Sequence, residues 1–325
     1  KDYEKAENYY QRALELFLTD SLNNLDRLAM VHNNLGIMFN AQAKNIQAIN
    51  HYKKSLELKK IINHRSIANT YGNLANLYAN NGELDEAEYY YKQAIRLDTL
   101  FNQNNQSLAR DYMNYGLLHL KKSNFGEAQK YLTKALRLKL SSLGSMHPET
   151  ARNYENLGYL EVKRGNTTRA LHYYQQSLLS LSEEFTDTSI YANPQIEGII
   201  SEPILLSILK RKATAFTQLT NNRTRHLQAA LNTYDLALEV IKQLRTGYQN
   251  QESKLLLTAN ERETYLQAIR TAARLHQRTQ NKEYLHEAFR YAEAGKAAVL
   301  YESMQSNQAL KVGNIPDSLQ NKENN

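Results

Sequence analysis

Four asparagines recur along the first half of the chain at nearly equal intervals, each directly before a Leu or Tyr. They lie 39, 41 and 42 residues apart, at Asn34, Asn73, Asn114 and Asn156. An asparagine side chain carries one acceptor and two donors on a short stem, so it can bond both the N–H and the C=O of an extended peptide. Because asparagine is an indifferent helix former, its recurrence in helical sequence needs a reason. We predict a ladder of contacts to a peptide backbone; alternatively, the amides bond neighbouring helices or only solvate the surface.

Basic residues share two further positions of the same alignment. Arg110 and Arg152 occupy one position, and Lys121 and Lys163 occupy the other. The two earlier units are neutral there, with Met30 and Asn69, then Ala41 and Asn80. Arg and Lys at these positions would favour carboxylates or phosphates on a partner, although they are equally read as solvated helix charges. Tyr159 is predicted to form part of an apolar floor of the binding surface; alternatively, it packs in the core, as such residues more often do.

No residue pattern predicts catalysis, a metal site or a cofactor in this segment. The chain has no Cys, and its nine His are scattered without a His-x-x-x-His pair. Neither a Gly-x-x-x-x-Gly-Lys loop nor a Gly-x-Gly-x-x-Gly motif occurs. Residues 164–168 superficially suggest a phosphate turn, but they fall between two expected helices. We therefore expect a non-enzymatic segment with no catalytic residue, no metal and no cofactor.

The recurring polar positions belong to sequence that predicts pairs of helices. Four segments, 31–39, 70–78, 111–119 and 153–161, align, and each is followed by a polar turn and a second helix. Small side chains let two antiparallel helices approach closely, so we expect the small residues of the two helices to face each other. The large residues four positions further on would fill the gap to the next unit, and stacking of units would supply the core. The recurring residues are Gly36, Ala75, Gly116 and Gly158 in the first helices, Ala48, Ala87, Ala128 and Ala170 in the second, then Tyr52, Tyr91, Leu132 and Tyr174.

These features resemble the tetratricopeptide repeat (TPR), which has small residues at two fixed positions and an aromatic residue four after the second. The period of about 42 residues resembles the longer variant of kinesin light chains, as does the run from His147 to Ala151. The resemblance covers residues 1–182 and implies an all-α, right-handed α-solenoid of helix–turn–helix repeats. It also implies that first helices line a concave groove, where kinesin-light-chain-like repeats use Asn to hold a peptide.

The pattern predicts four segments of chain. Residues 1–182 are the repeat array, made of the second helix of one unit and four further units. Residues 183–203 are an irregular connection. Residues 204–305 are degenerate TPR-like helices, in which Ala230, Tyr234 and Ala237 repeat the second-helix spacing. Residues 306–325 are a polar tail leading to a downstream domain that the chain lacks.

A second resemblance lies near the C-terminus. Residues 293–300, Ser303-Met304 and 313–319 resemble the region upstream of the CHAT domain in bacterial TPR–CHAT proteins, whose caspase-like peptidase uses a His and a Cys. Because this chain has no Cys, no catalytic residue is carried over. The resemblance implies a sensor or regulatory region of such a protease; the alternative is an ordinary terminal repeat.

Charge and composition limit the partners. The 325 residues carry a net charge of +7, with a sequence pI near 9.2. Lys and Arg are scattered without a run of five, which argues against nucleic acid, and no apolar stretch has the length of a membrane span. We expect a protein or extended peptide as partner, acidic where the basic positions lie, and an intramolecular contact with a downstream CHAT domain. The competing function is a structural scaffold that mediates assembly. The compartment is not determined, with the cytoplasm favoured.

Overall fold

The structure is a computed structural model that describes residues 3–100, 105–219, 223–248, 257 and 260–296. All regular elements in these ranges are helices, which confirms the all-α fold class. The chain divides into two compact units, residues 1–144 (unit 1) and residues 145–325 (unit 2).

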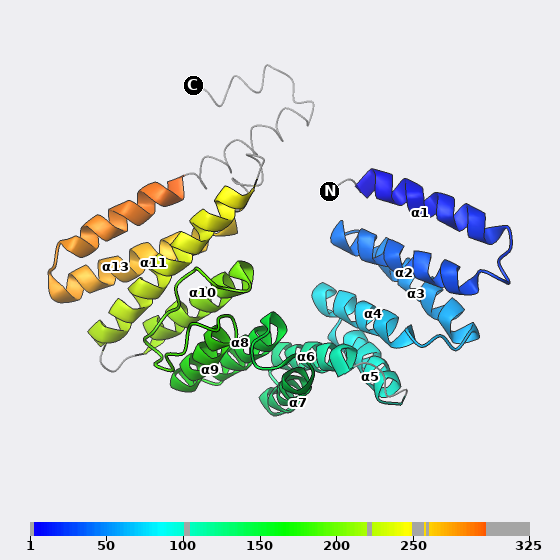
Figure 1. The fold of residues 1–325 in the computed structure, drawn as a ribbon, viewed down its shortest axis with the longest axis horizontal. Coiled ribbons are helices and arrows are strands. Elements are labelled where there is room, and N and C mark those ends of the chain that lie inside the picture. Colours follow the sequence, from blue (N-terminus) through cyan, green and yellow to red (C-terminus); the bar gives the residue numbers. More distant parts are fainter. Residues whose placement is uncertain (1–2, 101–104, 220–222, 249–256, 258–259, 297–325) are drawn as a thin grey trace, which may run out of the picture. The chain divides into compact units, whose positions relative to one another are not determined.

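Unit 1 is a stack of antiparallel helix pairs (Figure 1). Its pairs are α2 with α3, α4 with α5 and α6 with α7, and successive pairs meet where α3 contacts α4 and α5 contacts α6. The single helix α1 packs against α2. The bounds are α1 Tyr3–Leu18, α2 Leu25–Ala41, α3 Asn45–Ile61, α4 Ile67–Asn81, α5 Leu84–Leu100, α6 Asn105–Lys121 and α7 Phe125–Leu143.

Unit 2 repeats the same pairing and then extends it. Helix α8 packs with α9, and α10 with α11, while α13 packs against α11. Residues 283–296 are also helical. The bounds are α8 Pro148–Lys163, α9 Thr167–Leu179, α10 Glu202–Gln218, α11 Arg223–Gly247 and α13 Arg262–Thr279.

Two of the recurring glycines do not face the small residues of their partner helices, although the sequence had predicted that they would. A Cβ on Gly36 would lie 2.6 Å from the Tyr52 ring, and a Cβ on Gly158 would lie 2.5 Å from the Tyr174 ring. Each glycine therefore makes room for the large residue of its own partner helix. The expected facing of small residues is wrong at these two positions, because a tyrosine ring in the pair leaves no space for a Cβ.

Serines at equivalent positions of two second helices, α3 and α9, bond to their partner helices. Ser55 donates to the carbonyl of Ala29 at 2.7 Å, and Ser177 donates to the carbonyl of Ala151 at 2.6 Å, each across 26 residues. The pair α10–α11 is joined by a different contact: Tyr234 is 1% exposed, and its hydroxyl lies 3.0 Å from that of Thr214. Ala230, Tyr234 and Ala237 are all buried on α11.

The connection between α9 and α10 is part of the core of unit 2 although it is not helical. Ile196 is buried within it, and Tyr191 stacks on Phe216 of α10 at 5.5 Å. The fully buried Lys212 holds the segment by donating to the side chain of Gln175 at 2.7 Å, the carbonyl of Ala192 at 2.5 Å and the side chain of Asn193 at 3.0 Å. All three ammonium donors are satisfied, as burial of a lysine requires.

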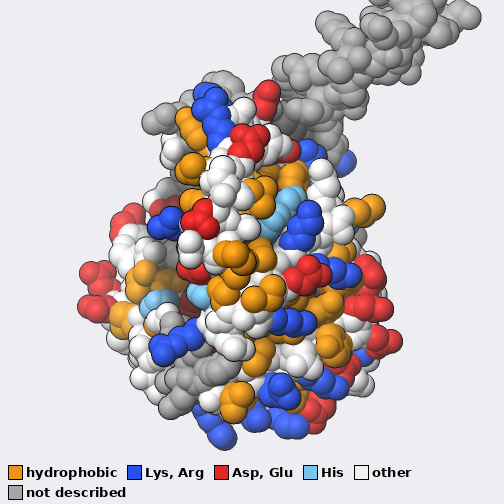
Figure 2. Space-filling view, turned by 90° about the vertical axis from the view of Figure 1, so that its right-hand side faces the viewer, with side chains coloured by type: hydrophobic (Ala, Val, Ile, Leu, Met, Phe, Trp, Pro, Cys, Tyr) orange, Lys and Arg blue, Asp and Glu red, His pale blue; other side chains and the backbone are white. Residues whose placement is uncertain are grey.

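Charges on the visible surface are mixed. Figure 2 shows basic, acidic and apolar side chains interspersed on one face of the molecule. Across the described ranges, no helix has the length and apolar character needed to cross a membrane.

Candidate functional site

The four recurring asparagines occupy equivalent positions on the first helices of successive pairs. Asn34, Asn73 and Asn114 are partly exposed on α2, α4 and α6 of unit 1. Asn156 on α8 of unit 2 is 8% exposed. We call the exposed sides of α2, α4 and α6 the first-helix surface of unit 1, and those of α8 and α10 the first-helix surface of unit 2.

The hydrogen bonding of these amides distinguishes the two interpretations of the asparagine ladder. Asn73 Nδ2 donates to Asn33 Oδ1 at 3.3 Å, a long bond to the neighbouring first helix. In the part of the chain that the structure describes, the side chains of Asn34, Asn114 and Asn156 make no hydrogen bond. Internal bonding therefore accounts for one of the four amides, and the other three keep donors and acceptors available.

The basic residues of unit 1 are engaged within the protein. Lys121 Nζ donates to the carbonyl of Ala79 at 3.0 Å, close to the C-terminal end of α4, where carbonyls lack helical partners. Arg110 donates to Asn69 Oδ1 at 2.9 Å and to Ser107 Oγ at 3.2 Å. These cations hold adjacent pairs together, so a partner would have to compete for them.

The basic residues of unit 2 are arranged around one aromatic ring. The Lys163 ammonium lies 5.3 Å from the centre of the Tyr159 ring, and the Arg211 guanidinium lies 4.3 Å from it. Arg152 is exposed, 3.8 Å from the Glu149 carboxylate. The Tyr159 ring therefore has two cations within cation–π distance.

A hollow of about 290 Å³ lies beside this ring between α8 and α10. Arg211 takes the position in α10 that asparagine takes in earlier first helices, since Arg211-Lys212-Ala213 aligns with Asn156-Leu157-Gly158. Glu155 binds Arg211 at 2.7 Å, and Lys210 pairs with Glu261 at 2.6 Å. The lining residues are Tyr159, Val162, Lys163, Tyr174, Lys210, Arg211, Thr214, Ala215 and Gln218. Among the described residues, Lys163 is the lining cation without a carboxylate partner, so it is best placed to meet an anionic group.

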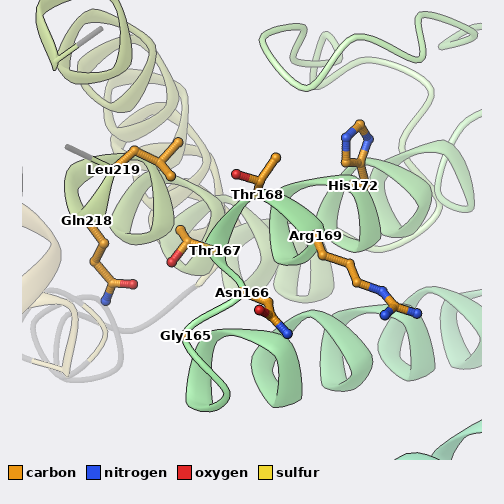
Figure 3. A pocket seen from close by; sticks show the side chains of 8 residues that line it. All are labelled: Gly165, Asn166, Thr167, Thr168, Arg169, His172, Gln218 and Leu219. Carbon is orange, nitrogen blue, oxygen red and sulfur yellow. The ribbon is translucent and has the colours of Figure 1, made fainter. Parts of the chain in front are cut away.

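A second and larger hollow, of about 700 Å³, lies at the turn between α8 and α9 (Figure 3). It contains the run that superficially suggests a phosphate turn. Figure 3 shows Arg169 and His172 on one side and Gln218 and Leu219 on the other, so these side chains do not converge. Asn166 Nδ2 instead donates to Glu161 Oε2 at 3.0 Å, as part of the turn. The geometry agrees with the interpretation of this run as an inter-helix turn.

The histidines of α2 and α3 form a contact that the sequence did not predict. His32 Nδ1 lies 3.0 Å from His51 Nδ1, and burial lowers the pKa of His32 to about 4. Burial also lowers the pKa of His51. Over the residues that are described, no group of three or more His, Cys, Asp or Glu side chains could hold a metal ion.

Sequence inspection also missed a series of buried charged residues at the ends of second helices. Lys59, Asp98 and Lys139 each lie 11 residues after the recurring alanine and are 3%, 2% and 2% exposed. Lys59 Nζ donates to Thr70 Oγ1 at 2.9 Å, and burial lowers its pKa to about 8. The regular spacing was a visible signal, but charged residues on a helix are usually solvated, so spacing alone would not have indicated burial.

Repeated antiparallel helix pairs that stack on one another within each unit define a helical-repeat protein of the TPR type. The sequence profile of the tetratricopeptide repeat matches residues 1–61, 27–100, 66–141 and 107–178, which together span more than half of the chain. The chain therefore belongs to the tetratricopeptide repeat family, whose members are generally scaffolds for protein interaction.

Solved structures show the same fold at low sequence identity. BtubC (BKLC) from P. vanneervenii is 18% identical, with a TM-score of 0.61, covering 77% of this chain and 95% of that one. The apo form of RapI is 14% identical, with a TM-score of 0.57 and 94% coverage of both chains. The APC/C hetero-tetramer Cut9–Hcn1 gives a TM-score of 0.52 at 16% identity, covering 90% of this chain and 46% of that one. No curated protein sequence matches the chain.

Proposed function

We propose that this chain is a non-catalytic module that holds an extended segment of a partner protein on its first-helix surfaces. The observation that supports this most directly is the set of asparagine amides at one repeat position, of which Asn34, Asn114 and Asn156 have no hydrogen bond within the described residues. Polar groups that are partly withdrawn from water and still unpaired gain most from a partner that supplies the missing bonds. A peptide backbone supplies one donor and one acceptor per residue.

The proposed partner is acidic where it meets unit 2. Lys163 stands over Tyr159 without a carboxylate partner in the described residues, and the exposed Arg152 has only the distant Glu149 carboxylate. The neutral first-helix surface of α2 and α4 would bind backbone without selecting charge. In unit 1, Arg110 and Lys121 would select an anionic group only by exchanging their present contacts for it.

The test begins with selection of binding peptides from a random display library on the wild-type protein. The variant with both Asn34→Ala and Asn114→Ala is expected to lose roughly tenfold or more in affinity for the selected peptide, because each removed bond contributes about 0.5–1.5 kcal/mol. A matched control replaces Asn8 and Asn50, which are exposed on α1 and α3, and should bind as wild type does.

The proposal also predicts which chemical change in the peptide matters. Methylating backbone nitrogens of the selected peptide should abolish binding at several positions, whereas alanine replacement of neutral side chains should have little effect. Unchanged binding by a folded double variant, or tolerance of backbone methylation throughout, would show that the asparagines do not hold a backbone.

The resemblance to TPR–CHAT proteins suggests a finer proposal, in which the module senses a ligand and regulates a caspase-like protease. Of the residues that carry that resemblance, only 293–296 are described, and they are helical; the others lie outside the described residues. Gly295 packs on the Tyr265 ring, with a Cβ position 3.3 Å from it. The sequence encoded after Asn325 is the direct check, since a domain with a paired His and Cys must follow if the proposal is right.

A structural scaffold is the second candidate function, and the exposed aromatic residues favour it. Tyr9 and Tyr89 are 68% and 56% exposed, and Phe289 is 67% exposed. Aromatic residues of this kind often anchor protein interfaces. Sedimentation of the isolated chain separates the candidates, because a tight homodimer that these tyrosines maintain would favour the scaffold.

A further inference from the structure

Two carboxyl groups are buried together where the second and third helix pairs of unit 1 meet. Asp98, near the end of α5, is 2% exposed, and Asp111 on α6 is fully buried. A Cβ on Gly72 of α4 would lie 2.9 Å from Asp111 Oδ1. Asp111 therefore occupies the space that Gly72 leaves open, and three helices close around it.

The junction between the first and second pairs shows how unusual this arrangement is. There the equivalent residues are Lys59 and Thr70, a donor and an acceptor joined by a bond of 2.9 Å. At the Asp98–Asp111 junction both residues are acids. Two carboxylates at one buried site repel each other, and each loses the solvation that stabilises its charge.

The surroundings leave these carboxyl groups with few partners. Among the described residues, neither oxygen of Asp111 accepts a hydrogen bond, and Asp98 Oδ2 accepts none. The nearest cation, Arg110, has its Nε 4.0 Å from Asp111 Oδ1 and directs its terminal nitrogen to Asn69 and Ser107.

The groups that face Asp111 come from every helix around it. They are Arg110 on its own helix, Asp98 and Tyr91 on α5, and the neutral Gly72 on α4. Burial raises the pKa of Asp111 to about 7, with Arg110 opposing the rise and Asp98 adding to it. Burial also raises the pKa of Asp98, against a hydrogen bond from Ser107 and the charge of Arg110.

We propose that Asp111, buried beside Asp98, keeps its proton at neutral pH, and that release of this proton loosens the packing of α6 on α4 and α5. The junction is then a pH-sensitive connection between two helix pairs. When Asp111 is ionised, it attracts Arg110 away from Asn69 and Ser107. Arg110 belongs to the first-helix surface of unit 1, so proton release would also alter the proposed binding surface. That last consequence rests on the proposed function, whereas the proton itself does not.

The sign of the effect on stability follows from proton linkage. Asp111 titrates near pH 3.8 in the unfolded chain and about 7 in the folded chain. Between these values the folded state binds more protons, so the stability of unit 1 falls as the pH rises from about 4 to 7 and then levels off. An asparagine at position 111 cannot ionise and removes this fall.

The direct test is a pH titration of aspartate side-chain carboxyl carbons by NMR on the full chain, prepared free of metal ions with a chelator. In the wild type, one resonance should titrate near pH 7, and it should disappear in Asp111→Asn. The matched control, Asp20→Asn, removes an exposed carboxyl group and should leave that resonance unchanged.

Hydrogen exchange of α6 amides provides a readout that needs no assignment of carboxyl groups. Protection in α6 should decrease between pH 5 and pH 8 after correction for intrinsic exchange, and it should stay constant in Asp111→Asn. Asp98→Asn tests the pair itself and should lower the midpoint of Asp111, because a neighbouring negative charge is removed.

Three results would overturn the proposal. The first is that every aspartate titrates below about pH 5. The second is that the hydrogen-exchange protection of α6 depends on pH in the same way in wild type and in Asp111→Asn. The third is that the titration midpoint of Asp111 falls when Na⁺, Mg²⁺ or Ca²⁺ is added. The third result would mean that a cation, and not a proton, neutralises the pair. Each is independent of peptide binding, so loss of this proposal would leave the proposed function standing, and the reverse also holds.

Discussion

Replacing Gly158 with alanine is expected to destabilise the α8–α9 pair, although the same substitution usually stabilises a helix. An alanine in a helix interior is favoured over glycine by about 0.8–1.0 kcal/mol. Here the new Cβ would lie 2.5 Å from Tyr174 Cε1 and 2.8 Å from Cδ1. Tyr174 is 1% exposed and cannot swing away. Overpacking of this kind costs about 1–3 kcal/mol, which exceeds the helix gain over most of its range, so we expect a net loss of up to about 2 kcal/mol.

The chain supplies a matched control for this substitution. Gly126 lies in α7, and a Cβ there would have nothing within 4 Å. Gly126→Ala should therefore stabilise its helix by up to about 1 kcal/mol. The two variants carry the same chemical change, so the opposite sign would come from packing alone.

Native-state hydrogen exchange is the suitable assay because a chain of two units has no single unfolding free energy. Protection in α8 and α9 should fall in Gly158→Ala, and protection in α7 should hold or rise in Gly126→Ala. Equal or greater protection of α8 and α9 in Gly158→Ala would refute the packing argument, since the tyrosine would then have room to move.

Three further predictions follow from contacts of the described residues. Ala87→Leu and Ala128→Leu should each cost about 1–3 kcal/mol by overpacking, because both alanines are fully buried; thermal melts within a degree of wild type would show that the pair register is wrong. Lys212→Met should expose the connection between α9 and α10 to limited proteolysis, since three hydrogen bonds to Gln175, Ala192 and Asn193 are lost; an unchanged cleavage pattern would mean that apolar packing holds the segment without them. Burial lowers the pKa of Lys212 from 10.5 to about 7. Between pH 7 and 10.5 the unfolded chain therefore binds more protons than the folded chain, so the stability of unit 2 should rise with pH over this range. Lys212→Met should not show this rise, because methionine does not ionise. Lys121→Met should cost about 0.3–1 kcal/mol by removing the cation that binds the Ala79 carbonyl at the end of α4; unchanged exchange of the last α4 amides would contradict this.

The helix pairs and their boundaries were the most predictable part of the protein. Gly36 and Gly158, with an alanine 12 residues later and a tyrosine four beyond that, marked positions where two helices approach. In the C-terminal half only the second part of this spacing recurs, as Ala230 with Tyr234 four residues later on α11. What the rule did not reveal is which side chain fills the space above each glycine. The answer depends on how each helix is rotated about its own axis relative to its partner. The spacing of residues along the sequence does not specify this rotation.

The candidate site was predictable in position but not in chemical state. Lys121 and Lys163 are equivalent in the alignment, yet Lys121 binds a helix carbonyl and Lys163 stands over an aromatic ring. Asp98 and Lys59 are likewise equivalent, but Lys59 binds a threonine hydroxyl, whereas Asp98 lies near a second acid, Asp111.

By itself, the sequence determined that this protein is a stack of TPR helix pairs, because small and large residues at short fixed spacings constrain how neighbouring helices can pack. The tertiary structure decided which polar groups are satisfied internally. Arg110 bonds to Asn69 across 41 residues, and Lys212 bonds to Gln175 across 37. Such partners meet only when stacked pairs bring distant residues together, and a hydrogen bond or a raised pKa depends on distances of a few ångströms and on the exclusion of water.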